Sequence, residues 1–467
     1  MYLGIDFGSS GVRGVLVDGT LQGRAHAALP LSGALDDPKA WLTLLPPLFR
    51  SLRAQCPEGM EALRALAIDG TSGTLLLCDG LGQALFPALL YSDQRATAEA
   101  QEIAQSWPQA GIAGAASSSL AKLLWLWRNV PAVRGACFLQ HQADWIAARL
   151  TGKPGLSDRG NLAKLGLDGA TLRYPQPLLH LLGQHGVPTR ILPQARREGA
   201  DLGPVHPDWA ARLGIPADTL VRAGCTDSVA AAIAAGLHET GQALSSLGSS
   251  LAIKVASRRP VADGAAGIYS HMLDDLYLVG AASNSGGAAL LRHFSRPEMM
   301  ELSCRLDPSQ PTGALVYPLP GMGERFPRHA AHWSGSMPPA GPPAWQFQAL
   351  LEGLAYIEAW AYALLAEHGA PCNGPVRSLG GGADNAAWMH MRANILNRPV
   401  AVLTDNEAAL GAALLAAAPD LGGLRQIQAG RRPETRLITP MPAAVAAYAP
   451  HTAAFRRHFA TAGNIFP

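Results

Sequence analysis

The chain opens with two short apolar runs on either side of a segment rich in glycine and serine. Residues 2–5 form the first run, residues 12–17 form the second, and Asp6-Phe7-Gly8-Ser9-Ser10-Gly11 lies between them. Short runs rich in Val, Leu and Ile that flank such a turn predict a β-hairpin. A Walker loop or a dinucleotide fingerprint requires a helix after its glycine-rich turn, so the second run disfavours both of these phosphate sites.

The same order of strand, turn and strand returns later in the chain. Residues 67–78 contain Asp69-Gly70-Thr71-Ser72-Gly73, and residues 243–255 contain Leu247-Gly248-Ser249-Ser250, each between apolar runs. Similar hairpins near residues 8 and 249 predict an internal duplication, with one copy in each half of the chain. This is the layout of an actin-like ATPase fold, in which paired hairpins hold the phosphates of a nucleotide.

The turn of the first hairpin carries groups that suit a phosphate and a cation. Gly8 and Gly11 allow backbone N–H groups to approach a phosphate, and Ser9 and Ser10 can donate hydroxyl hydrogen bonds. Asp6, at the end of the first predicted strand, could hold a hydrated Mg²⁺ ion. A hairpin without any ligand has the same pattern, so the segment by itself leaves both interpretations open.

A helix is predicted after Asp227. Residues 229–235 are helix formers and Gly236 ends the run, so Thr226, Asp227 or Ser228 lies at or beside the N-cap. Asp227 could simply cap this helix. The alternative is that its carboxylate accepts the proton of an attacking hydroxyl, because phosphoryl transfer requires a positioned base, a metal and charge-neutralising donors.

Three consecutive glycines, Gly380-Gly381-Gly382, separate a predicted strand at residues 376–379 from a predicted helix at residues 386–396. The glycines leave backbone free of side chains, against which an adenine ring could lie, or they serve a tight connection that needs positive φ. Asn385 follows closely enough to give the nucleotide an amide contact. Glu407 precedes another predicted helix and is expected to interact with its dipole.

Composition narrows the class of protein. The chain has 467 residues, of which 48% are apolar and 15% are charged, so two ordinary domains with buried cores are expected. The 37 Lys and Arg residues nearly balance the 35 Asp and Glu residues, which argues against nucleic acid as a ligand. The six cysteines include no CxxC pair, which disfavours disulfides and structural zinc.

The apolar runs do not indicate a membrane partner. Residues 408–418 are too short and too rich in small residues to span a bilayer, and the N-terminus has no signal-peptide pattern. A cytoplasmic protein without membrane or nucleic-acid partners is therefore expected. The sequence leaves open whether it is a monomer or a homodimer.

The ordered set of motifs resembles the FGGY carbohydrate kinases. The segments that carry the resemblance are residues 4–13, 224–228, 247–250 and 379–385, and they follow the family's order across nearly the whole chain. Residues 117–129 also look like the family's first signature, with Lys122 on a predicted helix. An amphipathic packing helix would give the same pattern, so Lys122 is assigned no role.

The resemblance implies an α/β protein with two actin-like (ribonuclease H-like) ATPase domains flanking a catalytic cleft, with ATP and Mg²⁺ as cofactors. Residues 1–237 would form the N-terminal domain, with the sugar site, the first phosphate motif and the catalytic aspartate. Residues 238–467 would form the C-terminal domain, with the second phosphate motif and the adenosine site. The implied ATP-binding residues are Gly8, Ser9, Ser10, Arg13, Gly248, Ser249, Gly381, Gly382 and Asn385.

By the same resemblance, Asp227 is the catalytic base. Asp6 and Asp227 are implied to contact the substrate and to hold Mg²⁺, directly or through water. The family usually has Thr where Ser9 stands, and serine keeps the hydroxyl donor.

Substrate choice depends on residues 69–73 and 91–96. Tyr91-Ser92-Asp93-Gln94-Arg95 resembles the family's Trp-x-Asp-x-Arg stretch at the sugar pocket, so Asp93 and Ser72 are implied sugar contacts, although a turn residue would look the same at Ser72. Residues 69–73 lack both the Gln-Met-His segment of ordinary xylulokinases and the glycerol-kinase pattern. Together with residues 284–287 and 323–327, they look more like a smaller branch of xylulokinase-like proteins that acts on D-ribulose. The predicted substrate is a ketopentose, D-ribulose ahead of D-xylulose.

Other activities are compatible with parts of the same pattern. A kinase for another ketose or a polyol would keep the same motifs, and an actin-like ATPase without a sugar substrate would keep the hairpins but would not need residues 91–96. A dinucleotide-dependent oxidoreductase requires GxGxxG between a strand and a helix, which no segment provides, so this class is set aside.

Overall fold

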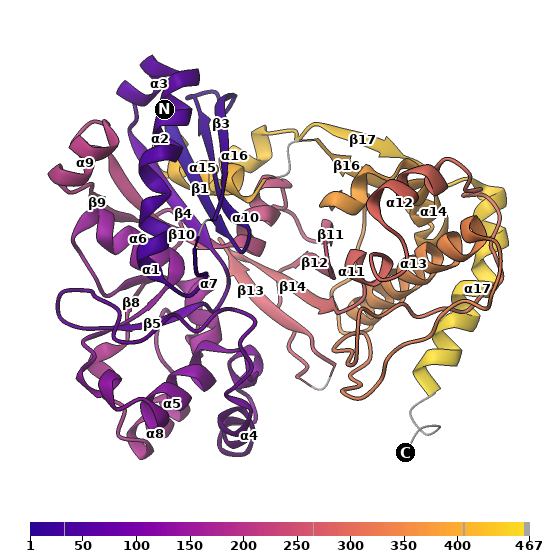
Figure 1. The fold of residues 1–467 in the computed structure, drawn as a ribbon, viewed down its shortest axis with the longest axis horizontal. Coiled ribbons are helices and arrows are strands. Elements are labelled where there is room, and N and C mark those ends of the chain that lie inside the picture. Colours follow the sequence, from indigo (N-terminus) through magenta and orange to yellow (C-terminus); the bar gives the residue numbers. More distant parts are fainter. Residues whose placement is uncertain (32, 265, 405–406, 462–467) are drawn as a thin grey trace. The chain divides into compact units, whose positions relative to one another are not determined.

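The hairpin predicted at the start of the chain is present. β1 (Tyr2–Gly8) and β2 (Gly11–Val17) pair antiparallel, with Tyr2 opposite Val17 and Gly8 opposite Gly11. In this computed structural model, which describes all residues except 32, 265, 405–406 and 462–467, the hairpin belongs to a six-stranded sheet with the order β3-β2-β1-β4-β10-β9 (Figure 1). The second strand confirms that the turn at residues 8–11 leads into a strand and not a helix.

Two units divide the chain. Unit 1 comprises residues 1–236, 271–275 and 407–432, and unit 2 comprises residues 237–270, 276–406 and 433–467. The division differs from the single boundary predicted between residues 237 and 238, because residues 271–275 and 407–432 pack with unit 1. One strand, β13 (Tyr269–Leu273), contributes residues to both units, because the division falls between residues 270 and 271.

The elements of unit 1 surround its six-stranded sheet and two small pairs of strands. They are β1, β2, β3 (Gly23–Pro30), α1 (Pro38–Thr43), α2 (Leu45–Gln55), α3 (Pro57–Glu61), β4 (Ala65–Gly70), β5 (Leu75–Cys78), α4 (Thr97–Ser106), α5 (Ser119–Asn129), β6 (Phe138–His141), α6 (Gln142–Thr151), β7 (Leu156–Asp158), α7 (Arg159–Leu162), α8 (Gln176–Gln184), β8 (Gln194–Arg196), β9 (Asp201–Pro204), α9 (Pro207–Leu213), β10 (Leu220–Thr226), α10 (Asp227–Ala234), α15 (Ala408–Ala417) and α16 (Leu424–Gly430).

The elements of unit 2 surround one larger sheet. They are β11 (Ala243–Leu247), β12 (Leu251–Ser257), β14 (Leu276–Ser283), α11 (Gly287–Leu290), α12 (Arg296–Ser303), α13 (Pro343–Glu367), β15 (Val376–Leu379), α14 (Ala386–Leu396), β16 (Val400–Leu403), β17 (Thr435–Ile438) and α17 (Pro442–Thr461). The hairpin predicted near residue 249 is formed by β11 and β12, with Leu247 opposite Leu251.

The two sheets repeat one topology, which confirms the predicted duplication. In unit 1, the antiparallel strands β3, β2 and β1 are followed by β4 and β10, each parallel to its neighbour, and by the antiparallel strand β9. In unit 2, β14, β12 and β11 are followed by parallel β15 and β16 and by antiparallel β17. The carboxyl ends of the three parallel strands therefore meet at one edge of each sheet.

The middle segment, residues 67–78, does not form the hairpin that its pattern predicted. β4 pairs with β1 and β10 in the main sheet, whereas β5 pairs with β6 in a separate two-stranded sheet. The buried, fully apolar strand β5 finds its partner far along the chain, which a local pattern of strand, turn and strand cannot reveal. The loop between β4 and β5 is consequently not a hairpin turn.

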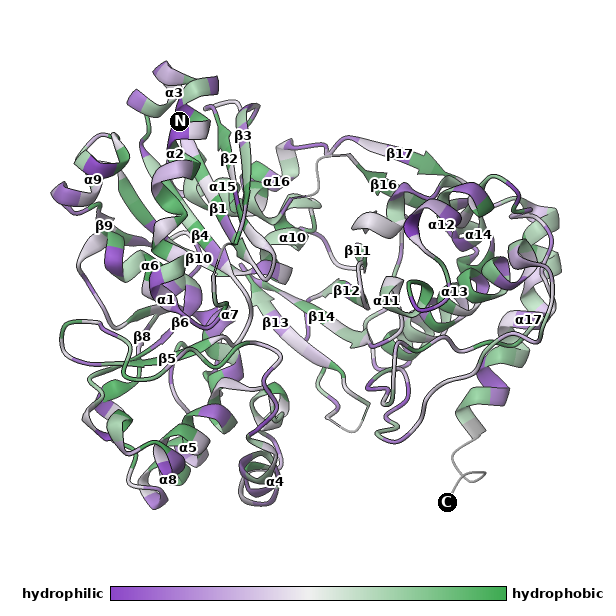
Figure 2. Cartoon of the chain, viewed as in Figure 1, coloured by the Kyte–Doolittle hydropathy of each residue, from purple (hydrophilic) through white to green (hydrophobic). Residues whose placement is uncertain are grey.

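Helix α15 belongs to unit 1 because small residues allow it to approach the sheet closely. A Cβ atom at Gly4 of β1 would lie 1.9 Å from the carbonyl oxygen of Ala409, and a Cβ atom at Gly411 would lie 1.9 Å from the carbonyl oxygen of Ala230 on α10. Glu407 precedes the helix, as predicted, and forms an ion pair with His26 at 2.7 Å. Figure 2 shows α15 coloured as hydrophobic, in keeping with its burial.

The longest apolar helix in the described part of the chain is α13, which is distinct from residues 408–418, the stretch predicted to be too short to span a bilayer. α13 has 25 residues and enough hydropathy to cross a membrane by length and composition. Within the described chain, 78% of its most apolar window is buried, and its side chains form much of the core of unit 2. Among the described residues of unit 1, one apolar core lies against the main sheet and another lies around α5, α8, β5 and β6.

Candidate active site

Three carboxylate side chains gather at the carboxyl edge of the sheet in unit 1. Asp6 on β1 is aligned with Asp69 on β4, and Asp69 is aligned with Cys225 on β10, two residues before Asp227. Because these strands are parallel neighbours, their carboxyl ends bring together side chains that are far apart in the sequence. The structure therefore groups the predicted residues Asp6 and Asp227 with Asp69, which the sequence analysis did not single out.

Asp69 has a strongly shifted pKa and belongs to a carboxylate cluster, which we define as Asp6, Asp69 and Asp227. Its side chain is fully buried, and neither of its carboxylate oxygens receives a hydrogen bond from an N–H or O–H group of the described residues. Burial first, then the negative charge of Asp6, and further that of Asp227, raise the pKa of Asp69 well above its usual value. The raised pKa means that Asp69 takes up a proton more readily than an ordinary aspartate.

Asp227 is the first residue of α10, directly after Thr226 at the N-cap. Its Oδ1 accepts a hydrogen bond of 2.7 Å from the backbone N–H of Ser228, and the residue is half-buried. The predicted position at a helix start is thus confirmed, while the N-cap itself is Thr226 and not Asp227. A carboxylate at this end of a helix is stabilised in its ionised form by the helix dipole.

The first hairpin presents its turn to solvent beside this cluster. Ser9 and Ser10 are exposed and Gly8 is half-buried, so their hydroxyl and N–H groups lie at the surface. Arg13, opposite Asp6 in the hairpin, donates a hydrogen bond from Nη1 to Oδ2 of Asp6 over 3.1 Å. Arg13 therefore orients the carboxylate of Asp6.

The two predicted sugar contacts lie on separate loops of unit 1. Ser72 follows β4 by two residues, and its Oγ is buried without a hydrogen-bond partner in the described part of the chain. Asp93 lies in an irregular segment, where its carboxylate accepts two hydrogen bonds from Nε of Arg95. Despite partial burial, which acts in the opposite direction, these hydrogen bonds and the charge of Arg95 lower the pKa of Asp93.

In unit 2, the predicted second phosphate motif lies at the exposed turn between β11 and β12. Gly248 and Ser249 are exposed, and their carbonyl oxygens accept hydrogen bonds from the N–H groups of Gly287 and Ala288, over 2.9 and 3.1 Å. A Cβ atom at Gly286 would lie 2.6 Å from the carbonyl oxygen of Ser249. The backbone of residues 286–288 therefore packs closely against this turn and donates hydrogen bonds to it.

The three glycines after β15 differ in whether a side chain would fit at their position. Gly380 has φ of +92°, and a Cβ atom there would lie 2.8 Å from the carbonyl oxygen of Leu247, so this residue serves the tight connection. A Cβ atom at Gly382 would lie 2.6 Å from the Trp388 ring. A Cβ atom at Gly381 would meet nothing within 4 Å, so Gly381 offers open backbone for a flat ligand.

Asn385 has a structural function in unit 2. Its side-chain oxygen accepts a hydrogen bond of 3.0 Å from the N–H of Trp388 and so caps α14, and its Nδ2 donates to Ser303 over 2.8 Å. The amide contact to a nucleotide predicted for Asn385 remains a prediction. β11 and β15 are parallel neighbours, with Ser246 opposite Leu379, so the turns that follow them lie side by side.

The described residues contain no group of three or more His, Cys, Asp or Glu side chains arranged to hold a metal ion by themselves. Mg²⁺ commonly binds through one or two carboxylates, several waters and the phosphates of a nucleotide. The oxygen donors of Asp6 and Asp227 and the unpartnered carboxyl of Asp69 fit this mode of binding. They do not form a complete protein cage for the ion.

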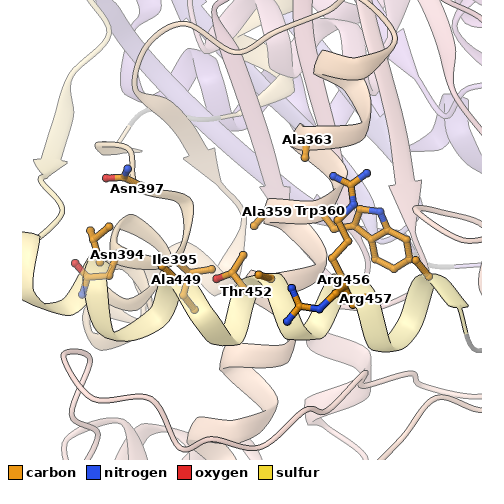
Figure 3. A pocket seen from close by; sticks show the side chains of 13 residues that line it. Ala359, Trp360, Ala363, Asn394, Ile395, Asn397, Ala449, Thr452, Arg456 and Arg457 are labelled. Carbon is orange, nitrogen blue, oxygen red and sulfur yellow. The ribbon is translucent and has the colours of Figure 1, made fainter.

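A separate pocket lies in unit 2 between α13, α14 and α17, with a volume of about 700 Å³ (Figure 3). Asn394 and Asn397 lie at one end, and Trp360 lies with Arg456 and Arg457 at the other; between the two ends, the pocket is lined by Ala359, Ala449 and Thr452. None of the predicted site residues lines this pocket. Its location therefore does not support the site assignments.

Comparison with known proteins identifies the family. Residues 1–234 match the N-terminal domain of the FGGY family of carbohydrate kinases, and residues 243–419 match the C-terminal domain. A xylulose kinase from Streptomyces coelicolor is 28% identical over 453 residues, covering 89% of this chain and 87% of the relative. One from Escherichia coli is 26% identical over 498 residues and covers 98% of both chains.

The fold agrees with this sequence similarity. The crystal structure of xylulose kinase from Rhodospirillum rubrum superposes with a TM-score of 0.86 at 25% identity and covers 99% of both chains. The family models match residues in both halves of the chain, and the two α/β sheets have the expected architecture. The chain therefore belongs to the FGGY family of carbohydrate kinases and is a sugar kinase, which confirms the resemblance inferred from its motifs.

Proposed function

We propose that the protein transfers the γ-phosphoryl group of ATP to the terminal hydroxyl of a ketopentose, D-ribulose or D-xylulose, giving the 5-phosphate and ADP. The observation that carries this proposal is the position of Asp227 at the start of α10, within the carboxylate cluster of Asp6 and Asp69. Similarity to xylulose kinases over most of the chain supports the pentulose substrate.

In this proposal, Asp227 accepts the proton of the attacking hydroxyl. The helix dipole of α10 favours its ionised form, and Arg13 fixes the carboxylate of Asp6 beside it. Ser72 and Asp93 would contact the sugar. Ser72 is suited to this role because its buried hydroxyl has an unused hydrogen-bonding capacity among the described residues.

The nucleotide is assigned to the two adjoining turns of unit 2 and to the first hairpin of unit 1. The exposed turn at Gly248 and Ser249, where the N–H of Gly248 donates to the carbonyl oxygen of Ser250, suits phosphate oxygens through Ser249, and the open backbone at Gly381 suits the adenine ring. Gly8, Ser9, Ser10 and Arg13 would add donors from the first hairpin. Mg²⁺ would be held by Asp6 and Asp227, directly or through water, and would neutralise phosphate charge.

D-Ribulose is placed ahead of D-xylulose because residues 69–73, together with residues 284–287 and 323–327, resemble a branch that acts on D-ribulose. A kinase for another ketose or for a polyol remains the alternative within the family. A cytoplasmic location is proposed because ATP, the phosphoryl donor, is available there.

The test is ADP release measured with D-ribulose, D-xylulose, L-ribulose and glycerol, each compared with a reaction without sugar. We expect release that depends on a ketopentose, and a fall in kcat of about 10²- to 10⁴-fold in Asp227→Ala, the usual effect of removing a general base. Nucleotide affinity should be retained. Asp218→Ala, which removes an exposed carboxylate from the same unit, is the control and should leave kcat unchanged.

Turnover without sugar that survives in Asp227→Ala would contradict the kinase proposal and favour an ATPase without a sugar substrate. Strict dependence on glycerol would instead replace the pentulose by a polyol.

A further inference from the structure

We propose that Lys122 is a positioning residue for the sugar site, because its ammonium group holds together the two loops that carry Ser72 and Asp93. This inference rests on the proposed function, because that proposal assigns Ser72 and Asp93 to the sugar. It assigns a role to the signature-like helix at residues 117–129 beyond apolar packing.

Lys122 is an unusual residue for its surroundings. It lies on α5, and its side chain is fully buried, as are those of Leu120, Leu123 and Leu124 on the same helix. A buried lysine is ordinarily paired with a carboxylate, because an isolated charge is costly to remove from water. Asp93 attracts Lys122 electrostatically, but its carboxylate is bound by Arg95.

The ammonium group instead binds the backbone of two loops. Nζ of Lys122 donates one hydrogen bond to the carbonyl oxygen of Gly73 over 3.0 Å and another to the carbonyl oxygen of Leu90 over 2.5 Å. We call residues 71–74 the first sugar loop and residues 90–95 the second sugar loop. Lys122 is thus a direct link between them, from a helix that belongs to neither.

Other hydrogen bonds hold the first sugar loop at each of its remaining residues. The N–H of Thr71 donates to Oε1 of Gln142 over 3.0 Å, and Nζ of Lys164 donates to the carbonyl oxygen of Ser72 over 2.7 Å. Thr74 receives a hydrogen bond of 3.0 Å from the N–H of Tyr91, at the start of the second loop. The loops are therefore fixed as a pair, and Lys122 supplies the charged contact between them.

This arrangement has a consequence for the sugar. Ser72 and Asp93 can contact one ligand only if their loops keep a fixed spacing, because a small displacement of a binding group weakens binding steeply. Loss of the Lys122 contacts would leave the carbonyl groups of Gly73 and Leu90 without this partner. The loops would then sample several spacings, and sugar affinity would fall more than the rate of the chemical step.

The charge of Lys122 responds to pH near neutrality. Burial chiefly, followed by the positive charge of Lys164, lowers the pKa of Lys122 to about 7, while Asp93 acts in the opposite direction and Arg95 lowers it further. A charged donor forms the stronger hydrogen bond to a carbonyl. Above this pH the link weakens, so KM for the sugar should rise with pH.

The experiment compares wild type with Lys122→Met, which keeps the length of the side chain and removes its charge and donors. We expect the sugar KM of Lys122→Met to rise at least tenfold, with kcat and nucleotide KM changed less than threefold. Between pH 6 and 8.5, the sugar KM of wild type should rise, and that of Lys122→Met should stay flat. Lys39→Met, an exposed lysine of unit 1, is the control and should behave as wild type.

A second control separates positioning from stability. Leu178→Ala removes a fully buried side chain from the same apolar core as α5 and should lower the midpoint of unfolding without changing the sugar KM. If Lys122→Met also lowers only the midpoint and leaves the sugar KM as in wild type, the positioning role is wrong.

A readout without catalysis keeps this inference distinct from the proposed function. Trypsin cleaves after Arg95, which lies on the second sugar loop and has a side chain 44% exposed. Lys122→Met should be cleaved there at least fivefold faster than wild type and Leu178→Ala under native conditions. Equal cleavage rates would overturn the link between the loops, whereas faster cleavage in a protein inactive on every sugar would contradict only the proposed function.

Discussion

Arg392 and Glu358 form a fully buried ion pair in unit 2, with Nε of Arg392 2.7 Å from Oε2 of Glu358 and Nη2 2.6 Å from Oε1. The pair also binds the two strands that precede the proposed nucleotide turns. Ser245 on β11 donates to Glu358 over 2.5 Å, and Arg392 donates to Ser378 on β15 over 2.9 Å. The ion pair therefore adds a side-chain link between β11 and β15, which already pair as parallel neighbours.

Arg392→Met should destabilise unit 2 because it leaves the carboxylate of Glu358 buried without its counter-charge. The expected loss in free energy of unfolding is about 3–5 kcal/mol, measured by urea denaturation. Nucleotide affinity should fall as well. The double variant Arg392→Met/Glu358→Leu should recover a large part of the lost free energy of unfolding, because it removes both charges. If its loss equals the sum of the losses in the two single variants, this account is contradicted.

Gly381→Leu should hinder nucleotide binding without unfolding the protein. A Cβ atom at Gly381 meets nothing within 4 Å, so the added side chain finds room in the protein but covers the backbone assigned to adenine. We expect the KM for ATP to rise at least tenfold, with the midpoint of thermal unfolding nearly unchanged. Gly374→Leu, equally open and in the same unit, is the matched control, and an unchanged KM for ATP in Gly381→Leu would remove Gly381 from the nucleotide site.

Asp69 should make unit 1 less stable as pH rises. Its pKa in the folded protein is raised well above the value of 3.8 expected for an unfolded chain, so folding binds a proton above that pH. The stability that Asp69 contributes is therefore complete below about pH 4 and is lost as pH rises toward the folded pKa, by up to about 1.4 kcal/mol per pH unit.

The measurement is urea unfolding of wild type and Asp69→Asn at several values from pH 5 to 8, without nucleotide, sugar or Mg²⁺. Wild type should lose stability relative to Asp69→Asn across this range, because the amide cannot titrate. Asp208→Asn, whose side chain is 92% exposed, should run parallel to wild type. A constant difference between wild type and Asp69→Asn would mean that Asp69 is ionised throughout the range.

Gly411→Ala tests the packing of α15 on α10. Alanine raises helix propensity by about 1 kcal/mol, so propensity alone predicts a more stable protein. The added Cβ would lie 1.9 Å from the carbonyl oxygen of Ala230, so packing predicts a loss of about 1–3 kcal/mol. We expect the loss in urea denaturation, while Gly430→Ala, with nothing within 4 Å of the new Cβ, should be neutral or stabilising.

Local elements were predictable because their signals are local. The turns at residues 8–11 and 248–250 and the helix that begins at Asp227 follow from a few neighbouring residues, and the structure contains all of them. The same reasoning failed at residues 67–78, because β5 pairs with β6 and not with β4. Strand pairing is decided by burial against distant segments, which a turn sequence does not report.

By itself, the sequence determined the family, the duplicated plan of two units and the residue types available for phosphoryl transfer, because these depend on short motifs and their order. Only the tertiary structure decided that Asp69 stands beside Asp6, that residues 407–432 return to unit 1, and that Lys122 binds Gly73 and Leu90. The physical reason is that burial and charge depend on which segments pack together. A lysine in an apolar helix has no evident partner until the fold brings two backbone carbonyls against its ammonium group.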